Sequence, residues 1–498
     1  MLLKIANSYS KAATQCLTVY VGQSGKDKVK TTNKNSIVGE LVKKYSASGE
    51  FKAGLGETLM LRAAGLENFQ NVMLVGIGNT KKLSEEVLRR ATAYAYRALR
   101  SEKQKASMIC FDSTEIFKLK LQVVGHVISE AAELTNYKYT QFLTEAKQHE
   151  VKLELVSSKA PDRKALSTGA KEGFLIAESI NFSRRVSDAP SNWMTPDQLA
   201  KETKKAAKDT GLKVSVWDGA KIQKEKMGSL WGVARGSAQD PRVIIMEYNG
   251  AAKSKTPIAF VGKGLTFDTG GISIKPSAGM EAMKYDMCGG ANVIGAMLAI
   301  AKLKLKVNVV AYIGAVENMP DGLAIKPGDI LTARSGKTIE VTNTDAEGRL
   351  VMADLLCLAS EKKPSSIFTM ATLTGAIIVA LGHLHTGFFT QDEKLNSKVQ
   401  DAADRAGEDL WRMPLLDEHQ KQMKSAYADI GNMGTPSRAA GSAQAAAFLK
   451  AFVANDVPYA HFDIASQMSD MGSYYPYHPD KGACGAMLRT FLEYARKS

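Results

Sequence analysis

The chain has 498 residues, more than one hydrophobic core usually organises, so the sequence predicts two domains. Hydrophobic residues make up 45% and charged residues 23%, a globular composition that excludes disordered, collagen-like and membrane-embedded classes. The formal charge is +14, and residues 1–160 hold 24 Lys and Arg against 15 Asp and Glu. No basic helix with interleaved aromatics stands out, so nucleic-acid binding is an alternative that is not favoured.

The sequence predicts a cytoplasmic protein with no membrane partner. Lys4 and several polar residues interrupt the first ten residues, where an export signal needs an apolar stretch. The most apolar later run, residues 375–381, is far shorter than the ~20 residues of a membrane-spanning helix. Five cysteines are scattered, odd in number and without a C-x-x-C pair, as expected for reduced thiols.

The first third of the chain alternates β-branched runs with helical patterns. Strands are predicted at residues 71–78, 106–111 and 151–155, and helices begin after Ser84 and cover residues 124–134. This alternation predicts a smaller N-terminal α/β domain over residues 1–160.

A long helical pattern at residues 162–186 predicts a connecting helix within residues 161–190, followed by a break where Thr195 is expected to cap the next helix. The rest, residues 191–498, is predicted to form a larger C-terminal α/β catalytic domain whose mixed, mostly parallel sheet is covered by helices. Its expected strands are residues 213–217, 242–246, 257–261, 307–312 and 366–370, and its expected helices include residues 290–303 and 350–360.

The most informative stretch is Val-Gly-Lys-Gly-Leu-Thr-Phe-Asp at residues 261–268, where an apolar strand meets charged residues. Ligands of open α/β sheets collect at the carboxyl ends of strands, so Lys263 and Asp268 are candidate site residues. A water-facing turn is the competing interpretation. The two glycines around Lys263 lack the third glycine of a dinucleotide-binding fingerprint, which argues against such a site.

More carboxylates follow in the sequence. Asp286 precedes an Ala- and Gly-rich helix, where a helix N-cap is the simpler interpretation. Asp345, Glu347 and Arg349 follow a predicted strand at residues 338–342, and an extended backbone would project all three to one side. A surface ion pair is the alternative, but the neighbouring Ala, Gly and apolar helix disfavour it.

Four acids in one crevice would raise one another's pKa unless cations neutralised them, so metal binding is expected. Oxygen ligands suit Mg, Mn or Zn, and bridging carboxylates suit two ions ~3.5–4 Å apart. Lys263 is an unusual candidate ligand, because its amine must be neutral. The H-E-x-x-H pattern is missing, and His383 and His385 are interpreted as loop residues without a metal.

The octapeptide Asn-Thr-Asp-Ala-Glu-Gly-Arg-Leu at residues 343–350 closely resembles the signature of the leucyl aminopeptidase (cytosolic aminopeptidase) family. The resemblance extends to the segments at residues 262–271, 283–286, 371–375 and 463–468. It implies a metal-dependent aminopeptidase that releases N-terminal residues, preferably Leu or other apolar ones, from peptides. A hydrolase of another N-terminal amide, such as a Cys-Gly dipeptide, would use the same residues.

The resemblance also implies roles for individual residues. One metal would be held by Lys263, Asp268, Asp286 and Glu347, and the other by Asp268, Asp345 and Glu347, with Zn or Mn, or else Mg or Co, as the ions. Lys275 would stabilise the oxyanion, and Arg349 would hold a bicarbonate ion as general base. Substrate-binding positions would be Met283, Asn343, Thr372, Leu373, Gly375, Ala465 and Met468. Family members form homohexamers, which the resemblance also implies here.

Overall fold

The computed structural model describes residues 1–7, 16–25, 28–33, 35–66, 68–110, 119–146, 149–252, 254–436 and 439–498. It divides into two compact units, Met1–Glu178 with Met471–Asp480, and Ser179–Asp470 with Lys481–Ser498. The change between them falls inside α4 (Ala160–Asp188), the long helix expected between the domains. The return of Met471–Asp480 to the first unit was not expected from the sequence. None of the described helices is both long and apolar enough to cross a membrane.

The first unit is built on a seven-stranded sheet in the order β1-β7-β6-β2-β5-β4, with β3 paired to β2. Its strands are β1 (Leu3–Ala6), β2 (Cys16–Gly25), β3 (Lys28–Thr31), β4 (Thr58–Leu66), β5 (Phe69–Asn79), β6 (Ala106–Cys110) and β7 (Lys152–Val156). Its helices, besides the first part of α4, are α1 (Ser36–Ala47), the short η1 (Thr80–Lys82), α2 (Glu85–Ser101) and α3 (Leu121–Asn136). The predicted strands and helices are present. Phe111, the last residue of one predicted strand, lies outside the described residues.

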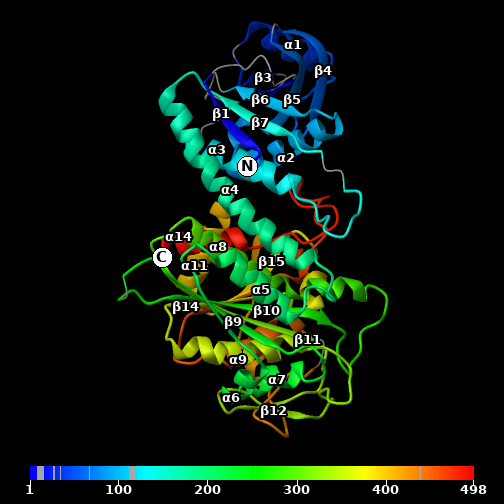
Figure 1. The fold of residues 1–498 in the computed structure, drawn as a ribbon, viewed down its shortest axis with the longest axis vertical. Helices are drawn as coiled ribbons and strands as arrows, with labels where there is room; N and C mark the ends of the chain where they lie inside the picture. The colour runs from blue at the N-terminus through cyan, green and yellow to red at the C-terminus, as the bar shows by residue number, and fades with distance from the viewer. Residues whose placement is uncertain are drawn as a thin grey trace. The chain divides into compact units, whose positions relative to one another are not determined.

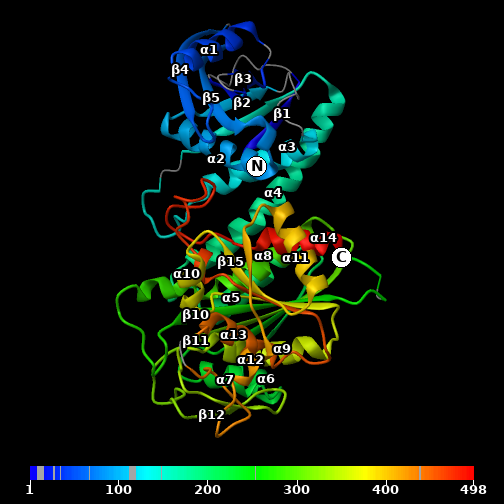
Figure 2. The same cartoon turned by 180° about the vertical axis from the view of Figure 1, so that it is seen from behind.

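Helices cover both faces of this sheet. Val38 and Val42 of α1 join the buried cluster on one face, while α2, α3 and the start of α4 pack on the other, as Figures 1 and 2 show from opposite sides. Ser84 caps α2 by accepting a hydrogen bond from Val87 N at 3.2 Å. The N-terminal unit is therefore the α/β layer structure that its alternating pattern predicts.

The second unit contains an eight-stranded sheet in the order β16-β15-β18-β14-β10-β11-β9-β8, and a small sheet in the order β12-β13-β17. The strands are β8 (Lys213–Trp217), β9 (Arg242–Asn249), β10 (Ile258–Asp268), β11 (Asn308–Asn318), β12 (Ile330–Thr332), β13 (Thr338–Glu340), β14 (Ser366–Ala371), β15 (Thr386–Phe389), β16 (Leu410–Met413), β17 (Ile430–Gly431) and β18 (Tyr459–Asp463). The predicted mixed sheet is confirmed, with the parallel pairs β11-β10-β14-β18 at its centre.

The helices of the second unit are α5 (Pro196–Ala207), α6 (Gly219–Lys224), α7 (Gly228–Ala234), η2 (Met280–Met287), α8 (Cys288–Lys302), α9 (Gly348–Glu361), α10 (Gly375–Leu381), α11 (Glu393–Ala406), α12 (Asp417–Lys421), α13 (Gly441–Lys450), η3 (Ala465–Gln467) and α14 (Leu488–Lys497). Helices α8, α11 and α14 lie on one side of the large sheet, and α7, α9 and α13 lie on the other (Figures 1 and 2). Thr195 caps α5 as predicted, accepting from Gln198 N.

Strand β10 is longer than the sequence predicts, because the glycines beside Lys263 do not end it. They allow close packing instead: a Cβ on Gly262 would lie 2.6 Å from the Gly290 Cα of α8. Lys263 is therefore a buried strand residue, 3% exposed, and the interpretation of this segment as a water-facing turn is wrong.

Candidate functional site

Four neighbouring strands of the large sheet end at one edge with polar residues. The strands β11, β10, β14 and β18 run parallel to one another, so their carboxyl ends meet. Asn318 and Asp268 end β11 and β10, Thr372 follows β14, and Asp463 ends β18. This edge is where the sequence placed a ligand site.

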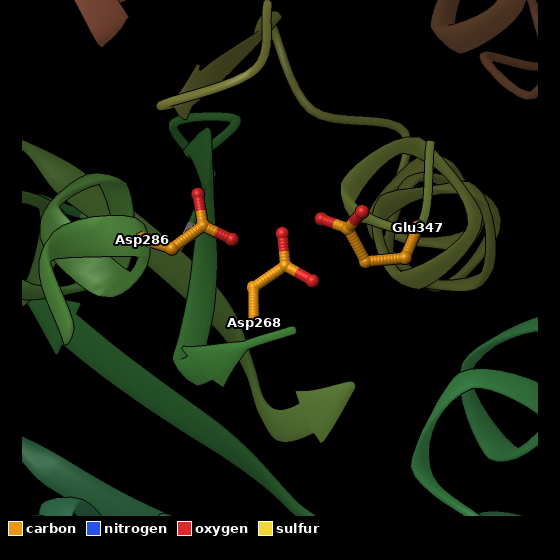
Figure 3. A group of neighbouring side chains, drawn as sticks. All are labelled: Asp268, Asp286 and Glu347. Carbon is orange, nitrogen blue, oxygen red and sulfur yellow. The ribbon is translucent and has the colours of Figure 1, made fainter. Parts of the chain in front are cut away.

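Three acids from distant parts of the chain converge there. Asp268 comes from β10, Asp286 from η2 and Glu347 from the N-cap of α9. One carboxylate oxygen of each lies within 4.8 Å of the others, and all three residues are buried, at 2%, 6% and 1% exposure. Figure 3 shows their carboxylates directed toward one another. Asp286 does not cap α8, since Met287 holds that position, so the simpler interpretation of this residue is wrong.

Lys263 lies among these acids. Its Nζ is 2.8 Å from Asp286 Oδ1 and 2.9 Å from Glu347 Oε1, and it donates a hydrogen bond of 3.0 Å to the Thr372 carbonyl oxygen. Burial acts to lower the pKa of Lys263, but the negative charges around it outweigh burial and raise that pKa.

A second lysine holds the other side of the cluster. Lys275 Nζ lies 2.9 Å from Asp268 Oδ2 and also contacts Asp345 Oδ1. Burial acts to lower its pKa, whereas the charges of Asp268, Glu347 and Asp345 raise it. Lys275 is thus a fixed positive charge beside the carboxylates.

Two of the acids, Asp286 and Glu347, have too few hydrogen-bond and charge partners among the described residues to offset the cost of their burial. Burial, followed by the charges of neighbouring acids, raises the pKa of Glu347, and burial also raises the pKa of Asp286 despite the nearby Lys263 charge. The buried oxygens Asp286 Oδ2 and Glu347 Oε2 have no hydrogen-bond partner among the described residues. Buried unpaired oxygens of this kind are unfavourable unless a cation meets them, so the cluster fits divalent metal ions.

The expected extended backbone at residues 345–349 is wrong. Asp345 lies in a turn, Glu347 has the φ and ψ of a right-handed helix, and Arg349 is already in the first turn of α9. Helix formation turns Arg349 away from an i, i+2, i+4 row, and its Nη1 donates a 2.7 Å hydrogen bond to the Asn432 carbonyl oxygen. Burial lowers the pKa of Arg349 to about 10, which leaves it charged near neutral pH.

A cavity of about 420 Å³ opens beside the cluster. Twelve of the fourteen predicted site residues line it: Lys263, Asp268, Lys275, Met283, Asp286, Asp345, Glu347, Thr372, Leu373, Gly375, Ala465 and Met468. The other two, Asn343 and Arg349, are absent from its wall. The Asn343 side chain instead accepts a hydrogen bond from Asp345 N at 2.9 Å, which supports the backbone of a wall residue.

Sequence reasoning missed several residues that build this site. Asn318 donates to Asp268 Oδ1 at 2.8 Å and to the Thr344 carbonyl oxygen at 3.1 Å, which orients the Asp268 carboxylate. Its place at the end of a parallel strand was the available signal. Met280 and Ile378 also line the cavity, but nothing in their sequence surroundings distinguishes them from core residues.

Two of the histidines make hydrogen-bond contacts within the protein. His383 lies in a turn, and its Nδ1 is 2.8 Å from the Ser466 carbonyl oxygen. His461 is fully buried beside Thr369, and burial lowers its pKa to about 3. Within the described residues, Asp268, Asp286 and Glu347 make the one group of His, Cys, Asp or Glu that is close enough to hold a metal ion. The five cysteines form no disulfide, as predicted.

Comparison with known families gives a match to each of the two units. The model for the cytosol aminopeptidase family, catalytic domain, matches residues 181–492, and that for the cytosol aminopeptidase family, N-terminal domain, matches residues 18–146. A probable cytosol aminopeptidase of Bdellovibrio bacteriovorus is 50% identical over 443 residues, which cover 89% of this chain and 88% of that protein. A probable cytosol aminopeptidase of Burkholderia mallei is 42% identical over 459 residues, 91% of this chain and 89% of that one.

Solved structures agree with the sequence relatives. The bottromycin maturation enzyme BotP in complex with Mn has a TM-score of 0.84 at 31% identity. That match covers 97% of this chain and 99% of BotP. A mutant of tomato leucine aminopeptidase has a TM-score of 0.86 at 29% identity, covering 100% of this chain and 96% of the tomato chain.

Proposed function

The chain belongs to the cytosol aminopeptidase family and is a metal-dependent aminopeptidase, and we propose that it releases N-terminal Leu and other apolar residues from peptides with the residues gathered around Lys263. The observation that carries this proposal is the buried cluster of Asp268, Asp286 and Glu347 beside a cavity. Two of its buried oxygens lack any partner in the described chain, so the acids fit a pair of divalent ions.

Two overlapping ligand sets are proposed. Lys263, Asp268, Asp286 and Glu347 would hold one ion, and Asp268, Asp345 and Glu347 the other. The oxygen-rich set suits Mn or Zn, with Mg and Co as further candidates. When bound, such ions lower the pKa of a water molecule and polarise the peptide carbonyl.

The chain's own residues supply the remaining functions. Lys275 lines the cavity with its Nζ 2.9 Å from Asp268 Oδ2, so its ammonium can donate to the oxygen that becomes negative during attack on the carbonyl. Lys263 must give up its proton to act as a ligand, since only the free amine has a lone pair. Arg349 would hold a bicarbonate ion as the general base, and its buried Nε has no hydrogen-bond partner among the described residues.

The cavity wall supports a preference for apolar first residues. Met283, Met468, Ala465 and Leu373 present apolar surface, and Gly375 has open space where a side chain would be. A wall of thioethers and small groups accepts unbranched and γ-branched chains such as Met and Leu. We also propose a homohexamer in the cytoplasm.

The nucleic-acid alternative gains no support from the relatives and structures named above, and we do not propose it.

A direct test of the peptidase function is hydrolysis of leucine p-nitroanilide by wild-type enzyme, by chelator-stripped enzyme, and after return of Mn or Zn. Stripped enzyme and Glu347→Ala are expected to lose nearly all activity. Glu361→Ala is the matched control, because Glu361 lies in the same helix with 51% of its side chain exposed. Full activity of a folded Glu347→Ala protein would overturn the proposal.

A further inference from the structure

Asp463 is a fully buried acid at the end of β18 that is in neither proposed metal ligand set. We propose that Asp463 is a positioning residue that fixes the wall of the substrate cavity and, through Thr372, the places of Lys263 and Asp286. This inference rests on the proposed function of the cavity and adds a determinant of its side-chain selectivity.

One oxygen of the Asp463 carboxylate accepts hydrogen bonds from two separate segments of the cavity wall. Its Oδ1 accepts backbone hydrogen bonds from Leu373 N at 3.1 Å, Thr374 N at 3.4 Å and Ala465 N at 3.3 Å. Leu373, Thr374 and Ala465 all line the cavity. A single oxygen thus ties the segment after β14 to the segment after β18.

The second oxygen fixes the helix that follows. Asp463 Oδ2 accepts from the Thr374 hydroxyl at 2.6 Å, and that hydroxyl in turn accepts from Ile377 N at 3.3 Å as the N-cap of α10. The Ser442 hydroxyl lies 3.0 Å from the same Thr374 oxygen. Because the Thr374 proton is used by Asp463, the direction of this hydrogen-bond chain depends on an acceptor at residue 463.

The segment after β14, which Asp463 holds, contacts two of the proposed metal ligands through Thr372. Its carbonyl oxygen accepts from Lys263 Nζ at 3.0 Å, and its hydroxyl donates to Asp286 Oδ1 at 2.8 Å. The Thr372 carbonyl belongs to the peptide group whose N–H, that of Leu373, bonds to Asp463. Rotation of that peptide plane would therefore move the oxygen that Lys263 faces.

A purely structural role for Asp463 is the competing explanation, since a buried acid can simply join two strand ends. The two explanations differ in what a mutation changes. A structural role predicts lower stability with unchanged selectivity, whereas a positioning role predicts an altered preference among first residues and a weaker hold on the metal ligands.

Asp354 provides a matched control within the same unit. It is also fully buried, and it accepts backbone hydrogen bonds from Leu230 N at 2.8 Å and Arg334 N at 2.7 Å. Neither Leu230 nor Arg334 lines the cavity. Asp354→Asn therefore removes a comparable buried charge without touching the wall.

The experiment compares Asp463→Asn, Asp354→Asn and wild type, each loaded with Mn, on leucine and alanine p-nitroanilides. Asp463→Asn is expected to lower kcat/KM for the leucine substrate by about 10- to 100-fold, the range for losing a hydrogen bond to a charged group. The ratio of leucine to alanine kcat/KM should also change by about 3-fold or more. Asp354→Asn is expected to keep the wild-type ratio. A folded Asp463→Asn enzyme with the wild-type ratio overturns the inference.

Two further variants keep the test decisive if Asp463→Asn does not fold. Thr374→Val removes the hydroxyl that Asp463 accepts from, and Thr374→Ser retains it, so Thr374→Ser is expected to lose less selectivity than Thr374→Val. Equal effects of the two overturn the inference. A crystal structure of Asp463→Asn or Thr374→Val is also expected to show the Thr372 oxygen displaced from Lys263 Nζ, and an unmoved oxygen contradicts the proposal. The position of this oxygen can be measured without any enzyme activity. An unmoved oxygen therefore counts against the positioning role of Asp463, whereas an inactive wild-type enzyme would count against the proposed peptidase function.

Discussion

Gly348 and Lys263 are packed so closely that no side chain fits between them. A Cβ on Gly348 would lie 2.6 Å from Lys263 Cε and 2.7 Å from its Nζ. Alanine is usually favoured over glycine within helices by ~0.5–1 kcal/mol, so helix formation does not explain the glycine at the start of α9. The glycine is instead explained by the Lys263 side chain, which passes this position on its way to the acid cluster.

A side chain at residue 348 is expected to disturb that contact. Gly348→Ala should push the lysine amine away from Asp286 and Glu347 and lower kcat/KM by about 10-fold or more, the effect of a small misplacement in an active site. Gly39→Ala, in helix α1 with nothing within 4 Å of the added Cβ, is the control and should leave activity unchanged. Steady-state kinetics and the bound metal content of both variants decide the matter. Wild-type values for Gly348→Ala would show that this packing has no bearing on the site.

Lys275 is predicted to act in the transition state more than in binding. Lys275→Ala should lower kcat by about 10²–10³-fold, the usual effect of removing one oxyanion donor, with a smaller change in KM. Lys326→Ala is a suitable control, because Lys326 is an exposed lysine paired with Asp329. Kinetics with leucine p-nitroanilide measure both parameters. An increase in KM alone would assign Lys275 to substrate binding instead.

Metal binding is predicted to release the Lys263 proton. Because the charges of Asp286, Glu347 and Asp268 raise the pKa of Lys263 despite its burial, protons compete with metal for the amine, and metal affinity should weaken as the pH falls. Calorimetry of Mn binding in two buffers of different ionisation enthalpy counts the protons released. Lys263→Met should release about one proton fewer than wild type. Equal proton release by both proteins would exclude a lysine ligand.

Selectivity for large first residues is predicted to depend on the space at Gly375. Nothing lies within 4 Å of a Cβ built there, and the residue lines the cavity. Gly375→Val should fill part of that space and reduce the leucine-to-alanine ratio of kcat/KM by about 10-fold, as expected for one or two methylenes in an apolar pocket. Competition assays with both substrates measure the ratio directly. An unchanged ratio would place the side-chain pocket elsewhere.

Asp354 is predicted to make the catalytic unit less stable as the pH rises. Burial raises the pKa of Asp354 to about 7, so between its unfolded pKa near ~3.9 and that value the folded state binds more protons. The stability it contributes is complete below pH ~4 and is lost as the pH rises through ~7. Urea unfolding of metal-free wild type and Asp354→Asn at pH 5 and pH 8 measures the free energy of unfolding. That free energy should fall more between pH 5 and pH 8 for wild type than for Asp354→Asn. Equal decreases in the free energy of unfolding for the two proteins would contradict a raised pKa of Asp354 in the folded state.

Local sequence patterns predicted much of the fold. Residues 213–217 were expected as a strand and form β8, and Thr195 was expected to cap a helix and does. Such features depend on neighbours in the sequence, which a pattern can reveal. The return of Met471–Asp480 to the first unit depends on contacts across hundreds of residues, among them that of the Tyr477 hydroxyl with Glu86 at 2.9 Å. No local pattern encodes such a contact.

The candidate site was predictable for a different reason. Resemblance to a family, and not periodicity, brought Asp286 and Glu347 together with Lys263, and the structure places them in contact. Local reasoning failed at Arg349, because an apolar helix starting at Gly348 overrode the expected extended backbone. Asp463 was seen only as part of a matched motif, since its hydrogen bonds to Leu373 and Thr374 become visible only when β14 and β18 pair.

We propose that Lys263 and the acids Asp268, Asp286, Asp345 and Glu347 share two divalent ions. Crystals grown with Mn and measured at the Mn absorption edge test it most directly, through the anomalous difference map. We expect two peaks ~3.5–4 Å apart, one beside Lys263 and Asp286 and the other beside Asp345, with Asp268 and Glu347 between them. A map without paired peaks at these side chains would contradict it.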